Sequence, residues 1–199
     1  MSSVRNVTPS NYPVAPGKYV QQYFDQFTNV LRLNLNNITN AINAPKVFGS
    51  YYDTTLQTNP VASAENLFTL NSTVVSYGTK VGSPTSRVYV GETGVYNIQF
   101  SAQLDKSGGG ASAVYIWLKI NGEPVPNSAG KVVINGPNSE IIPAWNFVVI
   151  LKANDYFELV WSSSDTAVVI LAEPAVPPVP QIPSIILTVT WVSGIPPRV

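Results

Sequence analysis

Side chains able to do chemistry are few in this 199-residue chain, because it contains neither histidine nor cysteine. The usual proton shuttle, the Ser-His-Asp triad, thiolate nucleophiles, disulfides and thiolate metal sites are therefore all excluded. Two neighbouring carboxylates, as in glycoside hydrolysis, are the catalytic option that remains. The best spaced pair is Asp155 and Glu158. On an extended strand a separation of three residues puts them on opposite faces, so they cannot flank one bond.

The other candidate sites lack the spacing that their chemistry requires. Asp53, Asp105, Asp165 and Glu173 are isolated, and none belongs to the dense carboxylate pattern of a calcium loop. The run 107–110 is rich in glycine, but it lacks the Lys-Ser/Thr pair and the following helix of a phosphate-binding loop. It is more typical of a flexible hairpin tip. The sequence thus predicts a protein that is not an enzyme and holds no metal or cofactor.

The charge composition points to self-association. Charged residues make up 11% of the chain, and the 11 basic and 11 acidic residues cancel, whereas 45% of the residues are hydrophobic. The cations are spread evenly, so no nucleic-acid partner is expected, and no apolar run approaches the roughly 18 residues of a membrane span. The start of the chain has no signal-peptide pattern. Near-zero net charge favours association, and we expect an obligate oligomer.

The first 44 residues differ from the rest of the chain. Residues 1–17 contain Pro9, Pro13 and Pro16, which predict an extended arm, with a disordered tail as the alternative. Residues 18–44 have helical periodicity and end at a proline. This helix either packs on its own domain or forms the stalk of an oligomer, and we expect the stalk. Its apolar positions form a seam, at steps of three and four residues: Val20, Phe24, Phe27, Leu31, Leu35, Ile38 and Ile42.

Residues 45–199 switch to a period of two, and turn residues separate short strands. With no helical segment between the strands, the pattern predicts an all-β sandwich. Five prolines in residues 173–183 predict a stiff exposed loop. The ten predicted strands are Val47–Tyr52, Asn66–Leu70, Thr73–Tyr77, Ser86–Val90, Val95–Leu104, Ala113–Ile120, Ile141–Leu151, Tyr156–Ser162, Ala167–Leu171 and Ser184–Val192.

Alternation within these strands predicts which faces are buried. Val95–Leu104 has one apolar face, containing Tyr96, Ile98 and Phe100, and one polar face. In contrast, Ala113–Ile120, Tyr156–Ser162 and Ser184–Val192 carry apolar residues on both faces. A two-layer sandwich covers only one face of each strand, so a neighbouring subunit is expected to cover the other. Scattered exposed aromatic residues, which are common in proteins, are the alternative.

Four segments resemble the complement and tumour-necrosis-factor-like jelly-roll superfamily. Gly94–Phe100 has its G-x-Y-x-x-x-F pattern, and Tyr115–Gly122 is similar to the strand and turn that follow. Leu151–Leu159 is similar to its L-x-x-G/N-D-x-Ω-x-L stretch, and Ser184–Val192 to its last strand. The resemblance implies a ten-strand jelly roll that forms a homotrimer and binds other molecules. It also implies that Tyr115, Trp117, Phe157 and Trp161 face the trimer axis.

Residues 48–110 resemble jelly-roll domains of tailed bacteriophages, which are structural proteins. This resemblance implies a virion protein, a capsid or neck decoration or head fibre, that binds other virion proteins through the arm. The alternative is the receptor-binding or glycan-binding head of a short tail fibre, with a host-surface glycan as its partner. The arm residues expected to attach the protein to the particle are Val4, Val7, Pro9, Tyr12, Pro13 and Val14.

Overall fold

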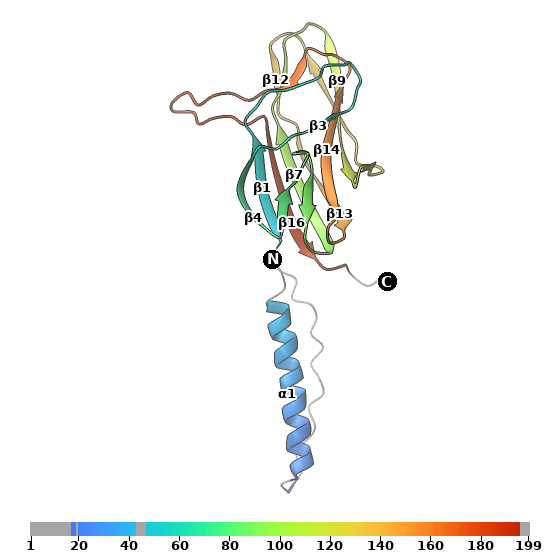
Figure 1. The fold of residues 1–199 in the computed structure, drawn as a ribbon, viewed down its shortest axis with the longest axis vertical. Helices are drawn as coiled ribbons and strands as arrows, with labels where there is room; N and C mark the ends of the chain where they lie inside the picture. Colours follow the sequence, from blue (N-terminus) through green and yellow to red (C-terminus); the bar gives the residue numbers. More distant parts are fainter. Residues whose placement is uncertain (1–16, 19, 43–46, 196–199) are drawn as a thin grey trace. The chain divides into compact units, whose positions relative to one another are not determined.

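The computed structural model of the chain describes residues 17, 18, 20–42 and 47–195. The chain divides into two compact units, Met1–Pro45 and Lys46–Val199. Among the described residues, the first unit contains one helix and the second unit contains the strands (Figure 1).

Helix α1 (Gln21–Ile42) lies within the predicted range 18–44, and the prediction of a single helix is confirmed. The carbonyl of Val20 accepts hydrogen bonds from the backbone N–H groups of Tyr23 at 3.0 Å and Phe24 at 3.4 Å, which starts the helix. The rings of Tyr23 and Phe27, one turn apart, stack with their centroids 6.3 Å apart. Within the described part of the chain, no helix is long and apolar enough to cross a membrane.

The described part of the second unit contains sixteen strands, whereas the sequence predicted ten. All ten are present with shifted ends. Six strands are additional, because Gln103 and Pro143 each interrupt a predicted strand and four others lie in segments between predicted strands. The strands are β1 (Phe48–Asp53), β2 (Gln57–Thr58), β3 (Asn66–Leu67), β4 (Ser72–Tyr77), β5 (Thr79–Val81), β6 (Val88–Val90), β7 (Gly94–Ala102), β8 (Leu104–Lys106), β9 (Ala111–Ile120), β10 (Glu123–Pro124), β11 (Gly130–Asn135), β12 (Ser139–Ile141), β13 (Ala144–Leu151), β14 (Tyr156–Ser163), β15 (Val168–Ile170) and β16 (Ile185–Ser193).

The long strands pair in a nested order. β1 pairs with β16, β6 with β14, β7 with β13, and β9 with β11, and every pair is antiparallel. The first strand therefore pairs with the last, and each following strand pairs with one closer to the middle of the chain. An antiparallel ribbon wrapped in this way is a jelly roll. The predicted all-β jelly-roll sandwich is confirmed.

The wrapped ribbon forms two layers with the core between them (Figure 1). One layer is a five-stranded sheet in the order β13-β7-β16-β1-β4. The other is a seven-stranded sheet in the order β10-β9-β14-β6-β5, with β11 beside β9 and β3 beside β14. Tyr96, Ile98 and Phe100 of β7 are at most 4% exposed, so the predicted core face of this strand is confirmed.

A small four-stranded sheet, in the order β12-β8-β15-β2, continues the five-stranded sheet beyond one end. Strand β15 takes the position there that β16 holds in the larger sheet. Between these two strands, residues 173–182 leave the sheet as a hairpin, with bridges Glu173↔Ile182 and Val176↔Val179. The sequence predicted a loop because proline cannot donate to a ladder, but the four bridging residues are not prolines. The predicted exposure of this segment is correct for residues 173–181.

Candidate self-association surface

On the outer face of the five-stranded sheet, three rows of side chains cross all five strands, and none of these side chains is charged. We call it the uncharged face. From β13 to β4, the rows are Val148-Asn97-Thr190-Phe48-Tyr77, Asn146-Gln99-Thr188-Ser50-Val75 and Ala144-Ser101-Ile186-Tyr52-Ser72.

Asp53 is the only Asp, Glu, Lys or Arg in the five strands of this sheet, all of which lie in the described part of the chain. Its side chain does not belong to the uncharged face, because the residue is 2% exposed. The Asp53 carboxylate accepts hydrogen bonds from the Thr55 backbone N–H at 2.7 Å, the Thr69 hydroxyl at 3.0 Å and the Asn71 amide at 3.1 Å. These donors satisfy the buried carboxylate, so the sheet presents no charge to its surroundings.

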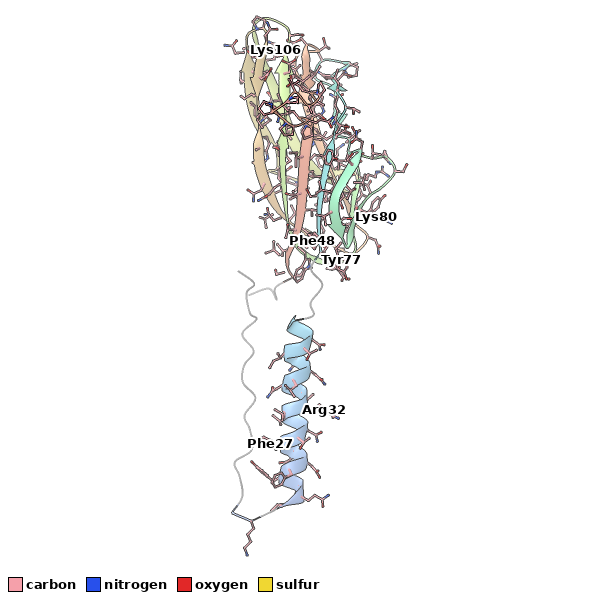
Figure 2. The ribbon with its side chains drawn as sticks, turned by 90° about the vertical axis from the view of Figure 1, so that its left-hand side faces the viewer. Phe27, Arg32, Phe48, Tyr77, Lys80 and Lys106 are labelled. Atoms are coloured by element: carbon pink, nitrogen blue, oxygen red, sulfur yellow. The ribbon has the colours of Figure 1, made fainter. Side chains whose placement is uncertain are left out.

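The uncharged face combines exposed apolar side chains with neutral polar ones. Phe48 and Tyr77 stack with ring centroids 6.4 Å apart, yet they are 37% and 62% exposed. Figure 2 shows both at one end of the sheet. Val148, on the opposite flank, is 64% exposed. On the same edge strand, the Asn146 amide donates a hydrogen bond to the Asn97 side-chain oxygen of β7 at 3.1 Å. Exposed apolar groups beside neutral hydrogen-bonding groups are typical of a contact surface.

Charged residues lie instead in the seven-stranded sheet, which contains Lys80, Glu123 and Glu158 among others. On β9, Lys119 forms an ion pair with Glu65. The two layers of the jelly roll therefore differ in charge.

The structure separates the four residues that were expected at a trimer axis. Phe157 and Trp161 are 0% exposed and belong to the core of their own chain, so the prediction that they face a neighbouring subunit is wrong. They project inward with Leu159 because all three lie on the same face of β14. Tyr115 and Trp117 lie on the outer face of the seven-stranded sheet, and Tyr115 is 41% exposed.

The burial of apolar Val160 on the second face of β14 is explained by its neighbours in the same sheet. Val160 lies beside Trp117 of β9 on one side and Leu67 of β3 on the other, and its side chain is 0% exposed. Trp117 and Leu67, in the same sheet, thus shield Val160 without any neighbouring subunit. Lys131 lies near these residues, with its Nζ 5.7 Å from the centroid of the Tyr115 ring.

The predicted helix seam is largely exposed on α1. The exposed fractions of its described members Val20, Phe24, Leu31, Leu35 and Ile38 lie between 39% and 54%, and Phe27 is half-buried. The side chain of Ile42 lies outside the described residues. The predicted attachment residues also lie outside them, and these are Val4, Val7, Pro9, Tyr12, Pro13 and Val14.

The carboxylates that could have formed a catalytic pair are engaged in structural hydrogen bonds. Asp155 accepts from the Lys152 backbone N–H at 2.7 Å and from the Asn121 amide at 2.8 Å, which fixes the turn before β14. Glu158 is 4% exposed and accepts from the Ser86 hydroxyl at 2.7 Å and Arg87 Nε at 3.4 Å. Within the described residues, no three side chains of the metal-binding types form a cluster.

Lys106 is buried completely and holds the glycine-rich turn, which the sequence predicted as flexible. Its Nζ donates to the carbonyls of Gly109 at 2.9 Å and Gly110 at 2.6 Å, and it lies 3.5 Å from the Asp165 carboxylate. Hydrogen bonds from the Ala167 backbone N–H and the Ser112 hydroxyl lower the pKa of Asp165, and the Lys106 ammonium lowers it further. This ion pair was not predictable from the sequence, because its partners are 59 positions apart.

A shallow cavity of about 650 Å³ lies at the β4–β5 side of the sandwich. Its polar lining includes Thr79, Lys80, Ser83 and Asn154, and its aromatic lining is Tyr89. Lys80 Nζ lies 5.9 Å from the centroid of the Tyr89 ring. A cation, an amide and an aromatic ring in one lining are groups that can bind a polar ring-shaped ligand.

Similar folds occur among solved structures. The globular domain of the zebrafish complement 1qA protein is 12% identical, covers 76% of this chain and 100% of its own, and has a TM-score of 0.46. The Eiger TNF of S. frugiperda is 8% identical, covers 78% of this chain and 98% of its own, and has a TM-score of 0.49. No protein-family model and no curated protein sequence matches the chain. At these sequence identities the similarity concerns the fold alone.

Proposed function

We propose that this protein is a structural, non-enzymatic component that assembles with copies of itself through the uncharged face. The observation that carries the proposal is the absence of charge from all three rows of that face, in a chain whose other layer is charged. Exposed Phe48, Tyr77 and Val148 supply apolar surface that gains free energy when it is covered.

A charge-free surface suits symmetric association for a physical reason. Near a symmetry axis each residue meets its own copies, so one charged side chain would become two or three like charges. Neutral groups such as Asn97, Gln99 and Thr190 can donate to and accept from their own copies instead. We propose three copies, because the strand motifs resemble those of homotrimeric jelly rolls.

Charge substitution tests the proposed surface. Val148→Asp places a carboxylate on the uncharged face, where association would bury it at a cost of several kcal/mol. Because Val148 is 64% exposed, the single chain tolerates the change. Val133→Asp is the matched control, since Val133 is 53% exposed on β11 in the other layer. We expect sedimentation equilibrium to show that Val148→Asp dissociates the oligomer and Val133→Asp does not. Equal association of both variants would overturn the proposal.

The helix provides a second contact in this proposal. Leu31, Leu35 and Ile38 lie on one seam and are 39–54% exposed, so copies of α1 can bury them against one another. We expect deletion of residues 1–44 to weaken the oligomer without dissociating it, because the uncharged face remains. Complete dissociation to monomers would assign the assembly to the helix instead.

The same proposal includes a role for the protein as a component of a virus particle. The resemblance of residues 48–110 to bacteriophage jelly-roll domains supports a virion component, a capsid or neck decoration or head fibre, bound to other virion proteins through residues 1–17. Three arms on one trimer would give durable attachment through their high effective concentration. We expect a chain lacking residues 1–17 to remain folded and oligomeric but not to incorporate into particles. Normal incorporation would exclude the arm as the attachment element.

Glycan binding is the second candidate function, and the cavity beside Tyr89 favours it. The Tyr89 ring can pack on a sugar ring, while Lys80 and Asn154 can bind its acidic and hydroxyl groups. Titration with acidic and neutral oligosaccharides tests this function, with Lys80→Ala as the variant and the exposed Lys152→Ala as the control. Binding of an acidic sugar that only Lys80→Ala abolishes supports the glycan function, and no binding by the parent chain rejects it.

A further inference from the structure

The hairpin of residues 173–182 is the most prominent projection of the second unit. It leaves the sandwich on the side of the five-stranded sheet and extends away from both layers (Figure 1). The hairpin contains no charged residue after Glu173, and the residues at its tip are Val176, Pro177, Pro178 and Val179. Val176 is 65% exposed and Val179 is 51% exposed.

The base of the hairpin is fixed to the sheet. Gln103, in the break between β7 and β8, binds both legs, since its carbonyl accepts from Leu171 N at 2.8 Å and its N–H donates to the Ser184 carbonyl at 2.9 Å. Ser184 N also donates to the carbonyl of Asp53 at 2.8 Å. Ser184 is 0% exposed and receives a further hydrogen bond from the Gln57 amide at 3.2 Å. The hairpin therefore starts from a buried, hydrogen-bonded anchor.

The hairpin itself is ordered in advance of any contact. Backbone hydrogen bonds of 2.8–3.0 Å join Glu173 to Ile182 and Val176 to Val179 in both directions. Pro174 and Pro180 each restrict one further φ angle, one in each leg. Because little conformational entropy is left to lose, covering the tip costs less than it would for a flexible loop.

We propose that this hairpin clasps a second copy of the chain, with its apolar tip against the body of the neighbouring subunit. This inference rests on the proposed function, because the hairpin projects on the same side as the uncharged face. Each leg has four residues, which span about 13 Å at roughly 3.3 Å per residue, whereas packed sheets lie about 10 Å apart. A copy packed on the uncharged face cannot avoid the hairpin, and the tip reaches past the facing sheet.

The absence of charge from the hairpin favours a second copy over a different partner. From Pro174 to Ile195 the described chain carries no Asp, Glu, Lys or Arg, so the hairpin and β16 form one continuous uncharged segment. Strand β16 is the central strand of the five-stranded sheet. One uncharged segment thus supplies both the middle of the uncharged face and the clasp beside it.

Two measurements on the full chain test the clasp. The double variant Val176→Asp/Val179→Asp charges an exposed tip, so each chain should still fold, and circular dichroism should match that of the parent chain. We expect the association constant to fall by about tenfold or more, measured by sedimentation equilibrium beside Val133→Asp as the control. Since the chain has no cysteine, Val176→Cys provides a single thiol for a maleimide photo-crosslinker. In a mixture of isotopically light and heavy chains, we expect mass spectrometry to find crosslinks between two chains.

The outcomes separate the clasp from the proposed function. If Val148→Asp dissociates the oligomer while the tip variant associates normally and crosslinks only within one chain, the clasp is overturned and the proposed function stands. If Val148→Asp has no effect on association, the proposed function fails, and reduced association of the tip variant with crosslinks between chains would still support the clasp.

Discussion

Gly94, at the start of β7, lies directly against the indole ring of Trp191 near the end of β16. A Cβ atom on residue 94 would overlap the indole nitrogen and lie 2.5 Å from the Ser193 carbonyl oxygen. That indole N–H donates to the Thr93 carbonyl at 3.4 Å, so the ring is held in place. The glycine of the G-x-Y-x-x-x-F pattern is thus explained by a close approach between two strands of the five-stranded sheet.

Gly94→Ala should destabilise the sandwich, because the methyl group forces Trp191 and the bulge of β16 to move. Overpacking of this kind costs about 1–3 kcal/mol. Gly109→Ala is the matched control, since nothing lies within 4 Å of a Cβ at that position. Denaturant unfolding of both variants measures the difference. Equal stability of the two variants would contradict the described packing of Trp191.

Lys106→Met should lower the free energy of unfolding by about 1–3 kcal/mol, because the charged Lys106 ammonium then no longer donates to two carbonyls of the turn. Methionine keeps the length of the side chain, so the loss reports the hydrogen bonds to Gly109 and Gly110 and the ion pair with Asp165 rather than an empty space. Lys152→Met, at an exposed lysine, is the control, and urea unfolding is the measurement. A Lys106→Met variant as stable as its control would mean that Lys106 does not hold the glycine-rich turn.

The stability of the sandwich should fall in alkaline solution through Tyr96. Burial raises the pKa of Tyr96 to about 12, and its protonated hydroxyl donates to the Glu92 carbonyl at 2.6 Å. The folded chain therefore keeps Tyr96 protonated at a pH where the unfolded chain ionises it. This contribution to stability is complete below about pH 10 and is lost as the pH rises toward 12.

Tyr96→Phe provides the comparison, since phenylalanine keeps the ring and has no ionisable group. Unfolding free energies measured between pH 9 and 12, at intervals of about one unit, should fall less steeply for the variant than for the parent chain. Parallel curves would show that another group causes the alkaline loss of stability.

The fold was predictable from alternation, but the position of the contact surface was not. Tyr96, Ile98 and Phe100 alternate with polar residues, which correctly placed one face of β7 in the core. The resemblance to trimeric jelly rolls misplaced Phe157 and Trp161, and alternation could not correct it. Alternation shows that a strand has two faces without showing which layer covers each of them. Val160 is shielded by Trp117 and Leu67, and that row depends on the register between strands far apart in sequence.

A different sequence signal indicates the uncharged face. The segments 66–79, 93–104, 141–151 and 174–195 contain no charged residue, and they include four of the five strands of one sheet. Only the nested strand pairing shows that these segments are neighbours. Lys106 and Asp165 illustrate the same limit, because their ion pair depends on a contact between distant segments.

The mass of the full-length protein in solution tests self-association through the uncharged face most directly. Sedimentation equilibrium at micromolar concentration should give three times the chain mass of 21.5 kDa for the parent chain, and the single-chain mass for Val148→Asp. A parent chain of 21.5 kDa at every concentration would contradict the account, since the exposed Phe48, Tyr77 and Val148 would then have no copy to cover them.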